Sequence, residues 1–380
     1  MSISSAFDSG AIEVVSLADH RDIQLRIKAD NASEFAQWFH FRLQGAEGLP
    51  VTLRFLNAGN SAYPEGWTDY QVVASYDRQH WFRIPSEYDG QVLSTQLTPA
   101  GNSLYFAYFE PYSDERHLDL IGFASVSDKV KLEPLGQTLD GRDMTLLRIT
   151  DSDSKTSLAQ KKNIWLTARQ HPGETMAEWF MEGFLERLLD GDDPVSRVLL
   201  ERCQFYVVPN MNPDGAARGN LRTNSVGANL NREWQAPSLE RSPEVFLVRQ
   251  RMLETGIDLF LDVHGDEALP YNFVAGCEGN PSYSPRLETL ENAFKAAWIA
   301  ASPDFQDRFG YGRDEPGQAN LTLATNWVGE HFDCLAYTIE MPFKDNADLP
   351  DPVYGWNGER SKKLGESVMQ PILAVLHQLR

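Results

Sequence analysis

The chain has 380 residues, of which 42% are hydrophobic and 11% aromatic, and its formal net charge is −20. A chain of this length can hold two or three domains with a sizeable core, and this composition excludes wholesale disorder. The acidic balance argues against nucleic acid or an anionic membrane as the main partner.

The amino terminus and the cysteines bear on the cellular compartment. Residues 1–13 contain neither a basic stretch nor an apolar one, so we expect no signal peptide, and no apolar run approaches membrane-spanning length. Cys203, Cys277 and Cys334 are odd in number and widely spaced, which argues against a disulfide framework and against a cysteine-based zinc site. These observations predict a cytoplasmic protein with its cysteines in the core.

Residues 1–125 predict an all-β domain. Short alternating or aromatic-rich segments are separated by turn clusters such as 44–48 and 57–60, and no long helical pattern appears. The expected strands are 23–27, 38–43, 51–56, 71–76 and 104–109. A β-sandwich is the natural architecture. Carbohydrate-binding modules use such sandwiches with exposed aromatic residues, but in a small sandwich we expect most aromatic residues in the core.

Residues 126–380 predict a second domain in which strands and helices alternate. The expected strands are 144–149, 164–168, 204–208, 257–263 and 335–341. The expected helices are 174–190, 242–255, 285–301 and 358–379. This alternation predicts an α/β fold with a largely parallel or mixed sheet and helices on both faces.

Two of the predicted strands lead directly into a histidine, His171 and His264. Open α/β sheets bind ligands at the carboxyl ends of their strands. Together with Glu174, these residues form a two-histidine, one-carboxylate set of the kind that holds catalytic zinc and leaves one position for water. Glu174 alone could simply favour the first turn of a helix, and Asp262 could either orient His264 or be purely structural.

Two further stretches carry polar residues suited to chemistry. The loop after strand 204–208 contains Gly219-Asn-Leu-Arg222 and then Asn229-Leu-Asn-Arg232. Guanidinium groups bind carboxylates bidentately and can stabilise an oxyanion, although a solvated loop would be the plainer reading. Glu340 ends an apolar strand, where an unpaired charge is costly unless it has a role such as general base beside a metal-bound water.

The order of these motifs resembles that of a known family. His-Pro-Gly-Glu (171–174), Asn-Pro-Asp-Gly (212–215), the two arginine motifs, Asp-Val-His-Gly (262–265) and Tyr-Thr-Ile-Glu (337–340) follow one another as in the carboxypeptidase A-like zinc carboxypeptidases. The preceding β-rich segment and the Gly-Asn-x-Arg element resemble the cytosolic carboxypeptidase subfamily. The likeness extends from about residue 130 to about residue 345.

The resemblance implies a zinc metallocarboxypeptidase that hydrolyses the carboxy-terminal peptide bond of peptides or proteins. One Zn²⁺ per chain would be bound by His171, Glu174 and His264. Glu340 would deprotonate the zinc-bound water and then protonate the leaving amine.

The resemblance also implies roles for the two arginine motifs. Arg222 would stabilise the oxyanion, and Asn231 and Arg232 would hold the terminal carboxylate of the substrate. Two other functions stay open at this point. One is a zinc amidohydrolase or deacylase acting on small N-acyl amino acids, and the other is a non-catalytic module that has kept the fold.

The sequence departs from the family pattern in two places. Members that trim glutamate are expected to have a basic residue shortly before the catalytic Glu, but no Lys or Arg lies between Asp314 and Glu340, and Thr325 occupies that zone. We therefore expect no strong preference for acidic terminal residues, unless Arg313 folds inward. The lid tyrosine of the secreted members has no clear counterpart, and Tyr311 is the nearby candidate.

Overall fold

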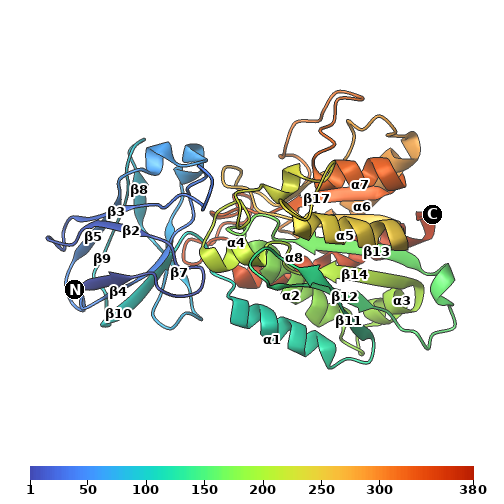
Figure 1. Cartoon of the computed structure of the whole chain (residues 1–380), viewed down its shortest axis with the longest axis horizontal. Coiled ribbons are helices and arrows are strands. Elements are labelled where there is room, and N and C mark those ends of the chain that lie inside the picture. Colours follow the sequence, from blue (N-terminus) through green and yellow to red (C-terminus); the bar gives the residue numbers. More distant parts are fainter.

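The computed structural model describes all 380 residues, which form a β-rich part and a larger α/β part (Figure 1). The β-rich part contains two five-stranded sheets. The first sheet has, in spatial order, β1 (Ser2–Ser4), β4 (His40–Gln44), β10 (Ser103–Ala107), β6 (Val72–Ser75) and β7 (Phe82–Ile84). The second has β2 (Glu13–Ser16), β3 (Ile23–Arg26), β5 (Val51–Phe55), β9 (Leu93–Leu97) and β8 (Ser86–Tyr88).

Several strands of this part alternate buried apolar side chains with more exposed ones. In β5, Val51, Leu53 and Phe55 are buried while the residues between them are half-exposed. Phe55 lies 4.5 Å from Phe39, ring centroid to ring centroid, so aromatic residues fill the space between the sheets. The predicted sandwich is confirmed. Two short 3₁₀ helices, η1 (Ala58–Asn60) and η2 (Pro64–Trp67), follow β5.

Helix α1 (Asp114–Ser125) connects the two parts and lies in a segment for which the sequence showed no helical pattern. Ser113 caps it by accepting a hydrogen bond from Arg116 N, and two acidic residues occupy its first turn. Its large apolar residues Leu118 and Phe123 are exposed, which is why the amphipathic signal is weak. The predicted domain boundary at residue 125 falls at the end of this helix and stays a prediction.

The α/β part is built on one seven-stranded mixed sheet, as predicted. Its order is β11 (Val130–Gln137), β12 (Asp143–Ile149), β14 (Cys203–Val208), β13 (Lys162–Ala168), β15 (Leu259–Val263), β17 (Leu335–Glu340) and β16 (Phe273–Ala275). The central strands β14, β13, β15 and β17 are parallel. The strands β12 and β16 flank them antiparallel, and β11 pairs antiparallel with β12.

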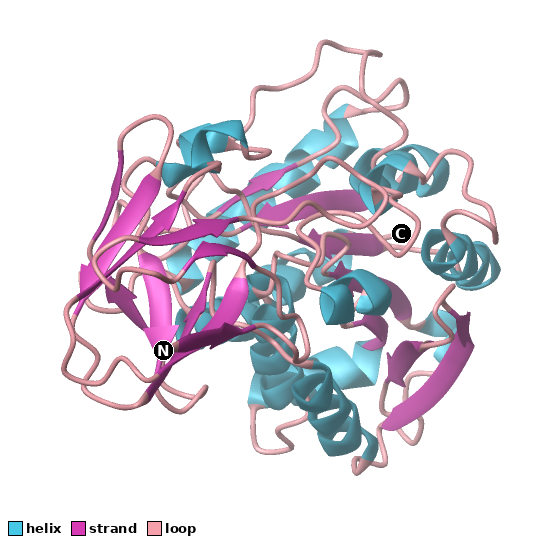
Figure 2. Cartoon of the chain, turned by 60° about the vertical axis from the view of Figure 1, so that its left-hand side comes forward, coloured by secondary structure: helices cyan, strands magenta, loops and turns pink.

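Helices cover both faces of this sheet, because its central strands are apolar on both sides (Figure 2). In β13, Ile164 and Leu166 pack in one core cluster, and Trp165 packs in the other. The first cluster is completed by α2 (Met176–Leu188), α3 (Pro194–Arg202), α6 (Pro285–Ala301), α8 (Gly358–Ser367) and α9 (Met369–Val375). The second is completed by α5 (Pro243–Thr255) and α7 (Ala324–Phe332).

The remaining elements are short, and several escaped the sequence analysis. They are α4 (Pro213–Arg218), η3 (Leu158–Gln160), η4 (Leu230–Arg232) and η5 (Leu376–Gln378). The elements α3, α4, α7, β11 and β16 were not predicted. The helix predicted over 358–379 is two helices, because Pro371 has no N–H to continue the hydrogen bonding of α8. The three cysteines are free and buried, as expected.

The two parts share one continuous hydrophobic core. Tyr108, which follows β10, stacks on Phe343 with ring centroids 4.5 Å apart. Arg83 donates hydrogen bonds to the carbonyl oxygens of Phe343 and Trp356, at 2.8 and 2.9 Å. The β-sandwich is therefore packed firmly against the α/β part. None of the helices combines the length and the apolar character that crossing a bilayer requires.

The close packing of α2 against α8 yields a stability prediction. A Cβ on Gly183 in α2 would lie 2.1 Å from the carbonyl oxygen of Lys362 in α8. We expect Gly183→Ala to lower the free energy of unfolding by about 1–3 kcal/mol, measured by denaturant titration, because the helices would have to separate. Gly191 has open space around it, so Gly191→Ala is the matched control and should change stability by less than about 0.5 kcal/mol. Equal stability of the two variants would contradict the close approach of α2 and α8 at Gly183.

Candidate metal centre and active site

The turn after β13 begins with Arg169, whose backbone conformation is strained. Arg169 has a φ of 59°, which is uncommon for a residue other than glycine, and its side chain is buried. The guanidinium offsets this cost by donating to the carbonyl oxygens of Pro172 and Tyr112, both at 2.9 Å, and to Glu178 Oε2 at 2.7 Å. These bonds fix the turn that carries Gln170 and His171.

The three predicted metal ligands meet at this turn. His171 Nδ1 lies 2.7 Å from Glu174 Oε1, and His264 Nδ1 lies 2.8 Å from Glu174 Oε2. The two imidazole Nδ1 atoms face each other at 3.2 Å. One ligand atom from each residue lies within 4.8 Å of the others, and all three side chains are buried. The structure therefore brings together the complete set that the sequence singled out.

The far nitrogen of each histidine is also engaged. His264 Nε2 lies 2.8 Å from Asp262 Oδ2, so Asp262 does orient this ring. Asp262 is held in turn by Thr167 Oγ1 at 2.8 Å and Gln170 Nε2 at 2.5 Å. His171 Nε2 lies 3.0 Å from Asn229 Oδ1. Partners of this kind fix the ring orientation of metal-ligating histidines and raise their basicity.

The charge states of His171 and Glu174 suit a bound cation. Burial lowers the pKa of His171 to about 4, so this imidazole is neutral at pH 7. Burial would raise the pKa of Glu174, but His171 and His264 lower it below its usual range, so the carboxylate is ionised. Two nitrogens and a carboxylate oxygen converging on one point suit Zn²⁺ or a similar divalent metal. The residues present therefore fit a zinc ion.

Glu340 ends β17 beside this cluster. Its side chain is only 6% exposed, and its Oε2 has no hydrogen-bond partner in the protein. Burial raises the pKa of Glu340 well above its usual range. The Tyr311 hydroxyl lies 3.1 Å from Glu340 Oε1 and 2.7 Å from Asp266 Oδ2. A carboxylate with one free oxygen in a buried site can accept a proton from a reactant.

All of the residues predicted for the site line one cavity of about 680 Å³. They are His171, Glu174, His264, Glu340, Arg222, Asn231 and Arg232. The Arg222 guanidinium carbon lies over the rings of Phe35 and Tyr63, 5.6 and 5.5 Å from their centroids. Burial tends to lower the pKa of Arg222, but neighbouring Tyr63 and Glu267 raise it, so the side chain stays cationic.

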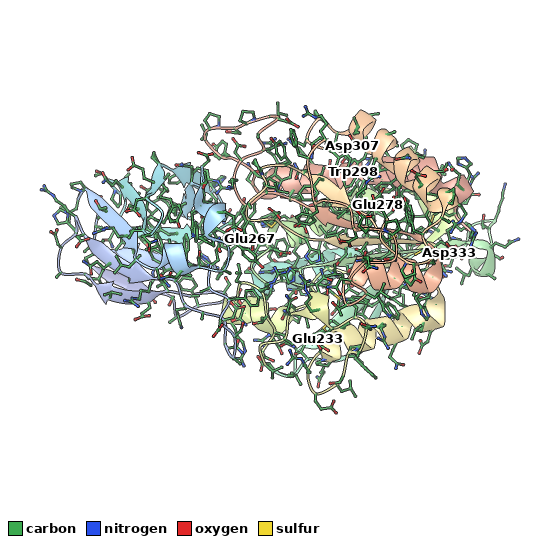
Figure 3. The ribbon with its side chains drawn as sticks, turned by 90° about the horizontal axis from the view of Figure 1, so that it is seen from above. Glu233, Glu267, Glu278, Trp298, Asp307 and Asp333 are labelled. Carbon is green, nitrogen blue, oxygen red and sulfur yellow. The ribbon has the colours of Figure 1, made fainter.

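The cavity also takes residues that sequence reasoning missed. Tyr63 and Glu65 come from the β-sandwich, and Glu267 lies at the junction of the two parts (Figure 3). Lys295 and Arg308 line the cavity as well. Arg313, the cation that the sequence did single out, also lines it, and its Nε lies 3.5 Å from Glu278 Oε1. The segment 314–340 does lack a cation, but cations reach the cavity from other segments. No local sequence pattern marks Lys295 or Arg308, because they lie in separate segments of the chain.

Comparison with known proteins identifies the chain. A model of the cytosolic carboxypeptidase N-terminal domain matches residues 3–109, and a model of zinc carboxypeptidases matches residues 122–357. The chain belongs to the zinc carboxypeptidase family. It is a metallocarboxypeptidase of the subfamily with an N-terminal β-sandwich, as the motifs suggested, and the deacylase alternative is not favoured.

Similar proteins agree in fold and domain organisation. A solved chain from Shewanella denitrificans is 58% identical over the whole of both chains, with a TM-score of 0.97. A metallo-carboxypeptidase from Pseudomonas aeruginosa, solved in complex with (2-guanidinoethylmercapto)succinic acid, is 51% identical over the whole of both chains, with a TM-score of 0.96. Cytosolic carboxypeptidase 2 of Xenopus tropicalis is 30% identical over 79% of this chain, which spans 34% of that protein.

The partner of His264 generates a prediction about metal affinity. If His171, Glu174 and His264 hold zinc, Asp262→Asn should weaken zinc binding about 10- to 100-fold, because the amide no longer supports the His264 ring as a carboxylate does. Competition with a chromophoric chelator measures the affinity. Asp22→Asn, which alters an exposed ion pair in the β-sandwich, is the control and should bind zinc as the wild type does. Wild-type affinity in Asp262→Asn would contradict the role of Asp262.

Proposed function

We propose that this metallocarboxypeptidase removes the carboxy-terminal residue of peptides or proteins with one Zn²⁺ per chain, held by His171, Glu174 and His264. The observation that carries the proposal is the convergence of these three ligand atoms beside Glu340 in one cavity. Zinc bound there would polarise the scissile carbonyl and make a water easier to deprotonate. A cytoplasmic location stays a prediction.

Glu340 is proposed as the general base. It would take a proton from the attacking water and pass it to the leaving amine, which requires an ionisable group close to both. Its buried position and its unpartnered Oε2 support this role. Tyr311 is the candidate for a residue that closes over the substrate, because its hydroxyl lies between Asp266 and Glu340 and its side chain is half-exposed.

Arg222 is proposed to stabilise the negative charge that develops on the carbonyl oxygen. Its guanidinium lies over two aromatic rings on the cavity wall. Few waters screen it there, so its attraction for a negative charge is stronger than it would be in bulk water. The loop that carries it also contacts the metal turn, since Gly173 N donates to Leu221 O at 2.8 Å. Arg222 is thereby held beside the metal ligands.

Asn231 and Arg232 are proposed to hold the terminal carboxylate. Asn231 Oδ1 accepts a hydrogen bond from Ala324 N at 2.8 Å, so its amide nitrogen stays available to donate. Arg232 is exposed on the cavity lining and donates to Asn231 O at 2.8 Å. The Pseudomonas aeruginosa relative is solved with a succinic acid derivative, which supports a cavity suited to carboxylates.

The side-chain pocket is proposed to lack a strong preference for acidic residues. Thr325 and Thr338, whose hydroxyl oxygens lie 2.7 Å apart, line the cavity in the zone where a basic residue would be expected. Arg313 is the nearest cation to this zone in the sequence, and its side chain is 66% exposed and faces Glu278. Its charge is therefore partly offset by a carboxylate and partly screened by water.

The role of Glu340 can be tested by an amide substitution. Glu340→Gln should lower kcat by at least about 10²-fold while zinc content and thermal stability stay as in the wild type, because the amide has the same shape but cannot accept the proton. Glu254→Gln changes an exposed glutamate of α5 and serves as the control. Activity of Glu340→Gln within about tenfold of the wild type would exclude Glu340 as the base.

The proposed specificity can be tested with matched peptides. We expect cleavage of peptides with a free terminal carboxylate and none of their amidated forms, because amidation removes the bidentate partner of Arg232. Among free peptides ending in Glu, Lys, Leu and Ala, the value of kcat/KM for Glu should exceed the others by less than about tenfold. Equal cleavage of amidated peptides would contradict the Asn231–Arg232 site, and a large advantage for Glu would contradict the proposed pocket.

A further inference from the structure

The loop that carries Arg222 is organised by a residue of the β-sandwich. Asp30 Oδ1 accepts a hydrogen bond from Leu221 N at 2.6 Å, and Asp30 Oδ2 accepts from Arg222 N at 2.8 Å. Asp30 Oδ2 also accepts from the Thr223 backbone N at 2.9 Å and from Thr223 Oγ1 at 3.0 Å. One carboxylate thus binds the backbone N–H groups of three consecutive residues centred on Arg222.

The bonds to Asp30 are buried and charge-assisted. Asp30 is 5% exposed, and burial raises its pKa above the ordinary value, a rise that the hydrogen bonds from Arg222, Leu221 and Thr223 offset only in part. A buried carboxylate is costly unless it is hydrogen-bonded, and here Oδ1 accepts one hydrogen bond and Oδ2 accepts three. The loop has little freedom to move while Asp30 is in place.

The same part of the β-sandwich supplies the aromatic groups around the Arg222 side chain. Asp30 N donates to Phe35 O at 2.7 Å, which closes the loop that carries both residues. Gln37 holds Tyr63 through two hydrogen bonds, from Tyr63 N to Oε1 at 2.8 Å and from Nε2 to Tyr63 O at 3.0 Å. The backbone and the guanidinium of Arg222 are therefore both placed by residues of the other part of the chain.

We propose that Asp30 is a positioning residue of the active site, through which the N-terminal β-sandwich sets the place of the Arg222 guanidinium. This inference rests on the proposed function, since it assigns Asp30 an effect on the reaction through Arg222. The β-sandwich is then a component of the catalytic cavity, and its removal would leave the Arg222 loop without its anchor.

Asp30→Asn tests the inference with little change of shape. Oδ1 and Oδ2 both face N–H donors, so either orientation of the amide would direct an NH₂ group at a donor. We expect kcat to fall about 10- to 100-fold with a smaller change in KM. The displaced Arg222 would stabilise the oxyanion less well, and that charge develops only in the transition state. Zinc content should equal that of the wild type.

Asn31→Ala is the matched control. Asn31 is adjacent to Asp30 and also bridges the two parts, through Asn220 and the carbonyl oxygen of Ser225, but it makes no hydrogen bond to residues 221–223. It should keep wild-type kcat within about threefold. An equal loss in Asn31→Ala would mean that any loosening of the junction lowers activity, which would overturn the specific role of Asp30.

A double-mutant cycle separates positioning from a general structural effect. If Asp30 acts through Arg222, Asp30→Asn should add less than about threefold to the loss caused by Arg222→Gln alone, since the group that it positions is already absent. Losses that multiply in the double variant would overturn the inference. Loss of zinc from Asp30→Asn would also overturn it, because Asp30 would then be supporting the metal turn.

Hydrogen exchange provides a readout that does not depend on activity. Asp30→Asn should speed exchange of the amides of residues 221–223, and Asn31→Ala should leave them protected as in the wild type. Unchanged protection in Asp30→Asn would overturn the inference whatever the activity. A wild-type enzyme that cleaves no peptide would instead contradict the proposed function, while the exchange result would still decide whether Asp30 organises the loop.

Discussion

The hydrogen-bonded register of β13, β15 and β17 is the constraint on which the site depends. Ala168 pairs with Val263, and Val263 pairs with Ile339, so three parallel strands end at the same level. The residues that follow these positions are the histidine turn, His264 and Glu340. His264 N donates to Ile339 O at 2.8 Å, so the hydrogen bonding between β15 and β17 continues to His264 itself. Parallel strands with level ends place chemistry from distant segments side by side.

Each buried charged group at this edge of the sheet has a partner of opposite charge or a hydrogen-bond partner. Glu174 faces two histidines, His264 also faces Asp262, and Asp262 accepts hydrogen bonds from Thr167 and Gln170. An unpaired charge is costly when it is buried. Removing one member of this network would therefore leave its neighbour buried without a partner. The strained Arg169 belongs to the same network, since its contact with Glu178 holds the turn that delivers His171.

The β-sandwich participates in the cavity as well as in the core. It contributes Tyr63 and Glu65 to the lining, and its Asp30 holds the backbone of the Arg222 loop. Gly66 packs against the cavity residue Glu267, where a Cβ would lie 2.9 Å from the carbonyl oxygen of Glu267. Residues of both parts therefore line one cavity.

The sequence by itself determined the elements and residues whose signals are local. The helix 285–301 follows from its apolar pattern, the central strands follow from short continuous apolar runs, and the ligand set follows from histidines at strand ends. These signals depend on near neighbours in the chain. Only the tertiary structure decided which distant groups meet there. Asp30 and Leu221 are 191 residues apart in sequence, and Lys295 and Arg308 reach the cavity from segments without a motif. Contacts of this kind depend on how the sheets pack, and packing is a property of the whole fold that no short stretch of sequence records.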